Sequence, residues 1–307
     1  MSQTFVIIGA STGLGHATAR ALARDHRVIV AGRDAARLRA EHPRAAAALP
    51  VDLASLDDAK RFGRELANHG PIHGLALNAG GQDAGAPTRT RDGFETTFAV
   101  NYLAHFAVVM SALPALAPAA RVVWVGSSTL EPDGAKLFGF RGGRYTSARA
   151  LAAGDGDPAV DDAQRAKDRY ATSKLCDVMA MAAIARRTDR IAALAIDPGL
   201  MPGTGLAKKH SAVARFLWHT VLHVVARFVP GTSSAARSGR AYAWVLASPE
   251  LAGTTGRYLD YRRRDLTWTG SDRIDRQDEL YATSLELCGF ARDPLAATAS
   301  RSPAAIK

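Results

Sequence analysis

Short apolar runs alternate with amphipathic helical patterns along most of the chain, and this alternation limits the possible folds more than any other feature. The run Phe5-Val6-Ile7-Ile8 is typical of a strand that is covered on both faces. Strands that are joined through helices pair in parallel, with right-handed crossovers. We therefore predict an α/β fold, a doubly wound parallel sheet with helices on both faces. The predicted strands are residues 5–8, 28–31, 49–51, 74–77, 121–125, 190–196 and 257–261, and the predicted helices are 17–25, 37–41, 56–68, 94–116, 170–187 and 278–287.

The chain has 307 residues without an internal repeat or an obvious linker, so we predict one domain over residues 1–307. Two segments interrupt the alternation. Residues 129–169 have no clean periodicity and are predicted to form an insertion before the 170–187 helix. Residues 205–235 are strongly apolar, which suits a substrate lid, a membrane-surface patch, a subunit contact or packing on the core. The tail at 300–307 is expected to be flexible.

Composition argues against several classes of protein. The formal charge is +10, but the basic residues are mixed with acids, and the densest basic cluster, at 262–264, is followed by Asp265. We therefore predict no nucleic-acid partner. The two cysteines, Cys176 and Cys288, fit neither a disulfide scaffold nor a metal spacing, so we expect buried reduced thiols and no metal. No apolar run reaches the ~18 residues of a membrane span and no secretory signal is present, so we predict no integral span and a cytoplasmic location.

A glycine-rich turn follows the first predicted strand and leads into a helix. A turn in this position presents free backbone N–H groups and the positive end of a helix to a pyrophosphate. Glycines let the backbone turn tightly and approach the phosphates closely. We therefore predict a nucleotide cofactor here, contacted by Gly9, Ser11, Thr12, Gly13, Leu14 and Gly15.

The residue after the second strand indicates which nucleotide is bound. Arg33 stands there, and its planar guanidinium suits the 2′-phosphate of NADP(H). Asp34 beside it keeps NAD(H) as the alternative, because a carboxylate suits a free ribose hydroxyl. NADP(H) is the predicted cofactor. Further contacts are expected from Asp52 and Leu53 at the adenine and from Asn78, Ala79 and Gly80 beside the ribose.

Tyr170 and Lys174 lie four residues apart, on one face of a predicted helix. A phenol is a poor acid–base group at neutral pH, and a nearby ammonium favours its phenolate. We expect Lys174 to lower the pKa of Tyr170 and to hold the nicotinamide ribose. Tyr170 would then give a proton to a carbonyl oxygen as hydride arrives from the cofactor. Ser128, after the fifth strand, would hydrogen-bond the same oxygen.

Together these features resemble the short-chain dehydrogenase/reductase family, with its Rossmann-type fold, from Phe5 to about Thr204. The resemblance implies that Asn101 is a fourth catalytic residue, which steadies a water that relays protons to Lys174. It favours Ser128 over Ser127 for the serine role. It also implies that three residues after the sixth strand contact the nicotinamide side of the cofactor, namely Pro198, Gly199 and Thr204.

Within the family the chain is most similar to the branch of protochlorophyllide reductases and retinol dehydrogenases, notably at 101–106, 173–176 and 197–199. This implies an NADPH-dependent reductase that acts on the carbonyl of a bulky apolar ketone or aldehyde, or the reverse oxidation. Leu200 stands where light-driven protochlorophyllide reductases carry a cysteine. Because this cysteine is missing, reduction of a C=C bond in a porphyrin-type pigment is the second choice of function. A regulatory NADP(H) sensor without turnover is the third. The family resemblance also suggests a possible homodimer.

Overall fold

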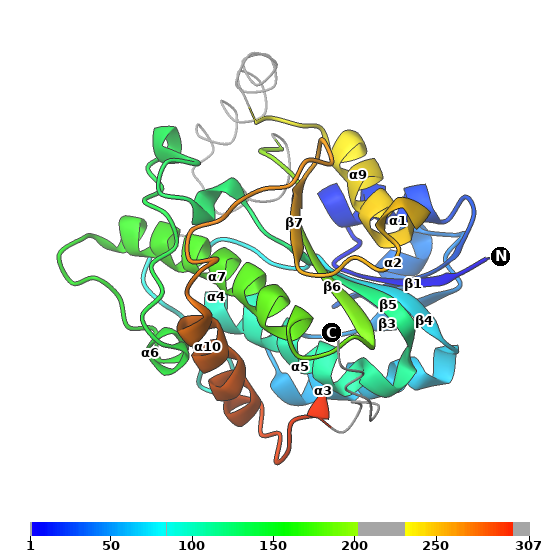
Figure 1. Ribbon diagram of the computed structural model, residues 1–307, viewed down its shortest axis with the longest axis horizontal. Helices are drawn as coiled ribbons and strands as arrows, with labels where there is room; N and C mark the ends of the chain where they lie inside the picture. Colours follow the sequence, from blue (N-terminus) through cyan, green and yellow to red (C-terminus); the bar gives the residue numbers. More distant parts are fainter. Residues whose placement is uncertain (1, 84, 202–230, 297–307) are drawn as a thin grey trace, which may run out of the picture.

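A seven-stranded parallel sheet forms the centre of the computed structural model, which describes residues 2–83, 85–201 and 231–296 (Figure 1). The strands are β1 (Thr4–Ile8), β2 (Arg27–Gly32), β3 (Ala47–Pro50), β4 (Ile72–Leu77), β5 (Leu116–Val125), β6 (Ile191–Asp197) and β7 (Arg257–Asp260). Their order is β3-β2-β1-β4-β5-β6-β7, and every neighbouring pair is parallel. The chain therefore winds outward in both directions from β1 and β4, which confirms the predicted doubly wound sheet. Ligands of such sheets bind at this switch point, outside the carboxyl ends of the strands.

Both faces of the sheet are covered, as the apolar strand runs predicted. In β1, Phe5 and Ile7 pack into the core on one face and Val6 and Ile8 into the core on the other, because successive side chains point to opposite sides. The first face is covered by α1 (Gly13–Leu22), α2 (Ala35–Glu41) and α9 (Ala235–Ala247). The second is covered by α3 (Leu56–Glu65), α5 (Ala104–Ala112) and α7 (Asp162–Ala185), with α10 (Ile274–Leu287) packed on α7 (Figure 1).

The predicted helix at 94–116 is interrupted. Glu95 caps its start by accepting hydrogen bonds from the N–H groups of Thr97 (3.0 Å) and Phe98 (2.7 Å). The chain then runs through α4 (Thr96–Phe98), a π-helical turn at Ala99–Leu103 and α5, and Leu116 already belongs to β5. The helical stretch Thr96–Ala115 is long and apolar enough to cross a membrane, but most of it is buried in the fold, as the core helix of a globular domain would be.

The largest further differences from the sequence prediction are at α7 and α9. Helix α7 starts at Asp162 rather than at 170, because the side chain of Asp161 accepts a hydrogen bond from the N–H of Gln164 at 2.8 Å and caps it. The predicted insertion is thereby shortened, and it contains α6 (Ala148–Ala153). Helix α9 was not predicted at all. Most of the 205–235 segment and the whole 300–307 tail lie outside the described residues.

Candidate active site

The glycine turn is held by close approaches of the backbone that leave no room for side chains. Gly9 has φ +86°, and a Cβ there would lie 2.7 Å from the Cα of Ala79. A Cβ on Gly15 would lie 2.3 Å from the carbonyl oxygen of Gly9, which accepts a hydrogen bond from the Asn78 amide at 2.8 Å. Asn78 therefore fastens the turn after β1 to the end of β4. The side chain of Thr12 does not cap α1, so the first N–H groups of the helix have no partner from that residue.

This geometry fits a dinucleotide phosphate, since the backbone can approach a ligand closely and the helix start carries partial positive charge. Gly13, at the first position of α1, also has a positive φ of +59°. The other residues predicted to contact the cofactor in this region are Ser11, which is half-buried, and Leu14 and Leu53, which are buried.

The two residues that could select the nucleotide, Arg33 and Asp34, both follow β2 but have different surroundings. Arg33 is exposed and, among the described residues, forms no ion pair. Asp34 instead caps α2, because its carboxylate accepts a hydrogen bond from the N–H of Arg37 at 2.9 Å. The carboxylate of Asp34, which would favour a free ribose hydroxyl, is thus already hydrogen-bonded to the backbone of α2.

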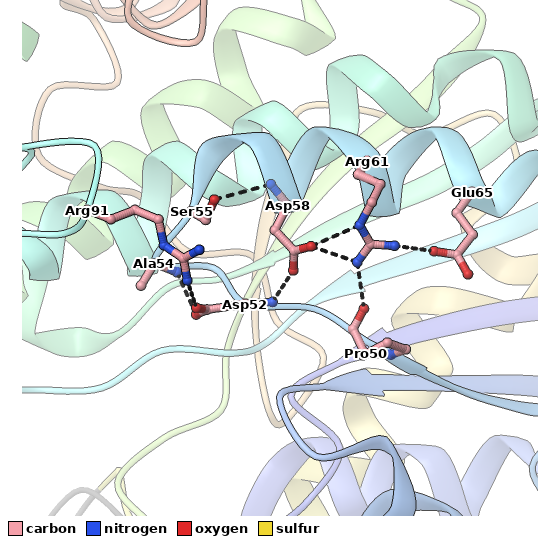
Figure 2. Close-up of polar contacts among 8 residues, drawn as sticks. All are labelled: Pro50, Asp52, Ala54, Ser55, Asp58, Arg61, Glu65 and Arg91. Atoms are coloured by element: carbon pink, nitrogen blue, oxygen red, sulfur yellow. Dashed lines mark hydrogen bonds and ion pairs between the residues drawn. The ribbon is translucent and has the colours of Figure 1, made fainter.

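Asp52 lies in a network that ties the loop after β3 to α3 (Figure 2). One carboxylate oxygen of Asp52 pairs with Arg91 at 2.7 Å, and the other accepts a hydrogen bond from the N–H of Ala54 at 3.0 Å. The N–H of Asp52 donates to Asp58 at 2.6 Å, and Asp58 in turn pairs with Arg61. The carboxylate of Asp52 is therefore held in place, and a contact with adenine remains a prediction.

Asn101 joins the cofactor side of the site to the catalytic helix. It lies in the π-helical turn, a feature frequent at functional sites. Its side chain pairs with both backbone groups of Gly81 at 2.9 Å and donates to the hydroxyl of Ser173 on α7 at 3.0 Å. A Cβ on Gly80 would lie 2.9 Å from Oδ1 of Asn101. The backbone carbonyl oxygen of Asn101 accepts a hydrogen bond from the ring of His105 at 2.9 Å.

Ser127, next to the predicted Ser128, acts on the phenol of Tyr170. Both Tyr170 and Lys174 are buried, and the side chain of Ser127 acts to lower the pKa of Tyr170. Ser127 has an extended backbone (φ −169°), and Ser128 starts a 3₁₀ turn. The catalytic role of Ser128 stays a prediction, with Ser127 as its alternative. Burial raises the pKa of Tyr170, while Lys174 and the side chain of Ser127 act to lower it; the effect of Lys174 has the predicted direction, but burial outweighs it.

Lys174 has an acidic partner that the sequence analysis missed. Its ammonium donates to the carbonyl oxygen of Val125 at 2.9 Å and to the carboxylate of Asp177 at 3.0 Å, and both side chains are buried. Burial raises the pKa of Asp177 to about 7, although Lys174 opposes this. The signal was present in the sequence, because Asp177 stands three residues after Lys174 and therefore on the same helix face.

The loop after β6 is fixed by hydrogen bonds. Asp197 is buried, which raises the pKa of its carboxyl to about 6, and it accepts a hydrogen bond from the N–H of Gly199 at 2.8 Å. The carbonyl of Pro198 accepts a hydrogen bond from Ser238 on α9 at 2.6 Å. Thr204 lies outside the described residues.

Comparison with known proteins agrees with this geometry. The family model for short chain dehydrogenases matches residues 3–138. A candidate daunorubicin C-13 ketoreductase (DnrU) of Streptomyces sp. strain C5 is 32% identical, over 85% of this chain and 84% of that protein. The chain belongs to the short-chain dehydrogenase/reductase family.

Two further members of the family have about the same sequence identity to this chain. Polyprenol dehydrogenase of Mus musculus is 33% identical over 92% of this chain and 83% of its own length. Protochlorophyllide reductase A of Triticum aestivum is 34% identical over 80% of this chain and 69% of its own length. The resemblance to this branch of the family is thereby confirmed.

Solved structures share the fold. A crystal structure of an uncharacterised protein from Mycobacterium paratuberculosis aligns with a TM-score of 0.66, at 25% identity and over 93% of both chains. A structure described as a candidate NAD(P)-dependent gluconate 5-dehydrogenase from Beutenbergia cavernae, with NADP bound, aligns with a TM-score of 0.61, at 21% identity and over 84% of this chain and 94% of that one.

Proposed function

We propose that this oxidoreductase transfers a hydride from NADPH to the carbonyl carbon of a bulky apolar ketone or aldehyde, or catalyses the reverse oxidation. The observation that carries the proposal is that the ammonium of Lys174 and the side chain of Ser127 both act on the buried phenol of Tyr170, in the direction that favours its phenolate. These groups adjoin the glycine turn through Asn101 and the loop after β4. This arrangement supports a proton donor and a nucleotide site that adjoin each other at the carboxyl ends of the strands.

Each side chain has a definite task in such a reaction. When bound, the cofactor supplies the hydride. The Tyr170 hydroxyl donates its proton to the substrate oxygen, where negative charge builds up, and the Ser127 hydroxyl hydrogen-bonds the same oxygen. Lys174 stabilises the phenolate that remains, because its positive charge is buried nearby. Asp177 holds Lys174 in position.

We propose NADPH rather than NADH as the cofactor, because Arg33 is free to meet a 2′-phosphate while the Asp34 carboxylate caps α2. The glycine turn, with Gly9, Gly13 and Gly15, would hold the pyrophosphate. The other proposed contacts remain those predicted from the sequence, namely Ser11, Thr12, Leu14, Asp52, Leu53, Asn78, Ala79, Gly80, Pro198, Gly199 and Thr204, together with Tyr170 and Lys174.

The names of the relatives support a large apolar substrate. One is described as a ketoreductase for daunorubicin and another as a dehydrogenase of polyprenol. The likeness to protochlorophyllide reductase favours a second candidate function, the reduction of a C=C bond. Two observations speak against C=C reduction. Leu200 stands where light-driven protochlorophyllide reductases carry a cysteine. Cys176 is fully buried and desolvation raises the pKa of its thiol, which makes it a poor proton donor.

A cytoplasmic location is also proposed, since Cys176 and Cys288 are free thiols, as expected in a reducing compartment. A homodimer is the proposed assembly. Light scattering on the eluate of a sizing column measures it, and a monomer at all concentrations would contradict it.

The function is tested by following NADPH absorbance in darkness with a panel of aliphatic, aromatic and polycyclic carbonyls. We expect turnover in the dark, highest with bulky apolar carbonyls. Turnover of a pigment only in light would favour C=C reduction. Binding of NADPH without turnover of any substrate in either direction would favour a regulatory sensor.

A further inference from the structure

Three side chains that can ligate a metal gather next to the glycine turn. They are His16, in the first turn of α1, Glu41, the last residue of α2, and His42, which follows it. One ligand atom from each lies within 4.8 Å of the other two. The imidazole rings of His16 and His42 are 4.6 Å apart between centroids, with a 51° tilt. The sequence analysis predicted no metal from the spacing of the cysteines, and His16 stands far along the chain from the adjacent Glu41 and His42.

The hydrogen bond of His42 leaves one ring nitrogen free for coordination. Its Nε2 lies 2.8 Å from the carbonyl oxygen of Ala10, inside the glycine turn. A carbonyl oxygen can only accept, so in the neutral ring the hydrogen lies on Nε2 and Nδ1 keeps its lone pair. Metal-binding histidines typically donate their second ring N–H to a backbone carbonyl in this way, which fixes the tautomer and the ring orientation.

The other two residues also have an unused ligand atom. Nδ1 of His16 is buried without a hydrogen-bond partner, and so is Oε2 of Glu41, among the residues that the structure describes. The second oxygen of Glu41 pairs with Arg37 at 2.7 Å, which holds the carboxylate in place. Polar atoms buried without a partner are uncommon in folded proteins, because each one costs desolvation free energy. A shared ion would satisfy both atoms at once.

The three side chains suit a metal that prefers nitrogen ligands. Two imidazoles and one carboxylate are a ligand set of Zn²⁺, whereas Mg²⁺ and Ca²⁺ prefer oxygen. The positive charges of Arg20 and Arg37 oppose a cation, so we expect moderate affinity.

We propose that His16, Glu41 and His42 bind one divalent transition-metal ion, with Zn²⁺ as the preferred ion. Around one Zn²⁺ the ligand atoms stand about 3.3 Å apart, so small side-chain rotations would complete the site. The ion would join the first turn of α1 to the end of α2 and, through His42 and Ala10, would brace the glycine turn. This goes beyond the proposed reaction and does not depend on it.

The test uses the full chain, without a histidine tag, after treatment with a chelator and in the absence of NADP(H). Calorimetric titration with Zn²⁺ should give one site per chain, and Co²⁺ should give the visible absorption bands of a four-coordinate site. We expect the variants His16→Gln and Glu41→Gln to weaken Zn²⁺ binding by about tenfold or more. His69→Gln is the matched control, since His69 comes just before β4, at the amino ends of the strands, whereas the glycine turn follows the carboxyl end of β1.

Zn²⁺ should also raise the melting temperature of the wild type and of His69→Gln, but not that of His16→Gln. Circular dichroism of the metal-free variants shows whether they are folded. The proposal is overturned if the wild type binds no Zn²⁺, or if folded His16→Gln and Glu41→Gln variants bind it as tightly as the wild type does. Because metal binding itself is measured, failure of the proposed reductase activity would leave this result unaffected.

Discussion

The two ends of the predicted cofactor site are built by different means. At the glycine turn the structure depends on backbone geometry, because Gly9 and Gly15 sit where any Cβ would collide with neighbouring main chain. Around Tyr170 it depends on buried side chains from the π-helical turn and α7, together with the carbonyl of Val125 in β5. Backbone constraints leave a local signature in the sequence, whereas a side-chain cluster depends on how distant segments meet. The predictions below test this contrast.

The largest effect is expected at the side-chain end. Tyr170→Phe removes the proposed proton donor and should lower kcat about 10²- to 10⁴-fold. NADPH binding, measured by fluorescence titration, should remain close to that of the wild type, because the glycine turn is untouched. A Phe variant with full turnover would remove Tyr170 from the mechanism.

A pair of serine variants tests which of the two adjacent serines, Ser127 or Ser128, assists the reaction. Ser127→Ala should lower kcat by about 10²- to 10³-fold, since it removes a hydrogen bond to the developing oxyanion. Ser128→Ala is the matched control and should change kcat little. Steady-state kinetics of both variants decide the question, and the reverse ranking would restore the serine favoured by the family resemblance.

The choice between the two serines is hard to make from the sequence for a physical reason. Ser127 and Ser128 are adjacent, and the backbone changes from extended at Ser127 to a 3₁₀ turn at Ser128. That turn has no marker of its own in the sequence. Asp177 was missed for a different reason. Its spacing from Lys174 was visible, but its burial, which gives the ion pair its effect, depends on the surrounding helices.

The sheet and the glycine turn were predictable because both follow from local rules. Continuous apolar runs such as that of β1 reflect burial on both faces, and the helices between them require parallel pairing. Helix α9 is hard to predict because it begins at Ala235 and its cap, Ser234, lies at the end of the apolar segment 205–235. The early start of α7 was missed because its first turns carry charged residues, and the Asp161 cap was overlooked.

At the backbone end, Arg33→Ala should weaken NADPH binding by about ten- to a hundredfold, the effect of losing charge-assisted hydrogen bonds to a phosphate. NADH binding should change little, because NADH has no 2′-phosphate. Fluorescence titrations with both cofactors provide the measurement. Equal weakening of both would show that Arg33 does not select the nucleotide.

A glycine variant tests whether steric constraint really governs this end. Gly15→Ala places a Cβ 2.3 Å from the Gly9 carbonyl oxygen, and such overpacking should lower the free energy of unfolding by about 1–3 kcal/mol. Gly156→Ala is the control, because its Cβ would meet only the flexible side chain of Arg165, at 3.1 Å. Urea denaturation compares the two variants. Equal stability would contradict the account of the turn.

The smallest expected effect is a pH dependence at the side-chain end. Burial raises the pKa of Asp197 to about 6, so the folded protein keeps a proton that the unfolded chain loses near pH 4. Its contribution to stability is therefore complete below about pH 4 and is lost as the pH rises to about 6. Asp197→Asn should reduce the fall in unfolding free energy over this range, by about 2 kcal/mol at most. Denaturation of both proteins at several pH values checks this, and parallel curves would contradict it.

The central claim is that one nicotinamide ring would meet Tyr170, Ser127 and Lys174 while the rest of the cofactor follows the glycine turn. A crystal structure of the complex with NADP⁺ tests it most directly. We expect the nicotinamide beside the Tyr170 hydroxyl, the pyrophosphate over residues 9–15 and the 2′-phosphate against Arg33. A nucleotide bound elsewhere, or a nicotinamide out of reach of Tyr170, would contradict the account.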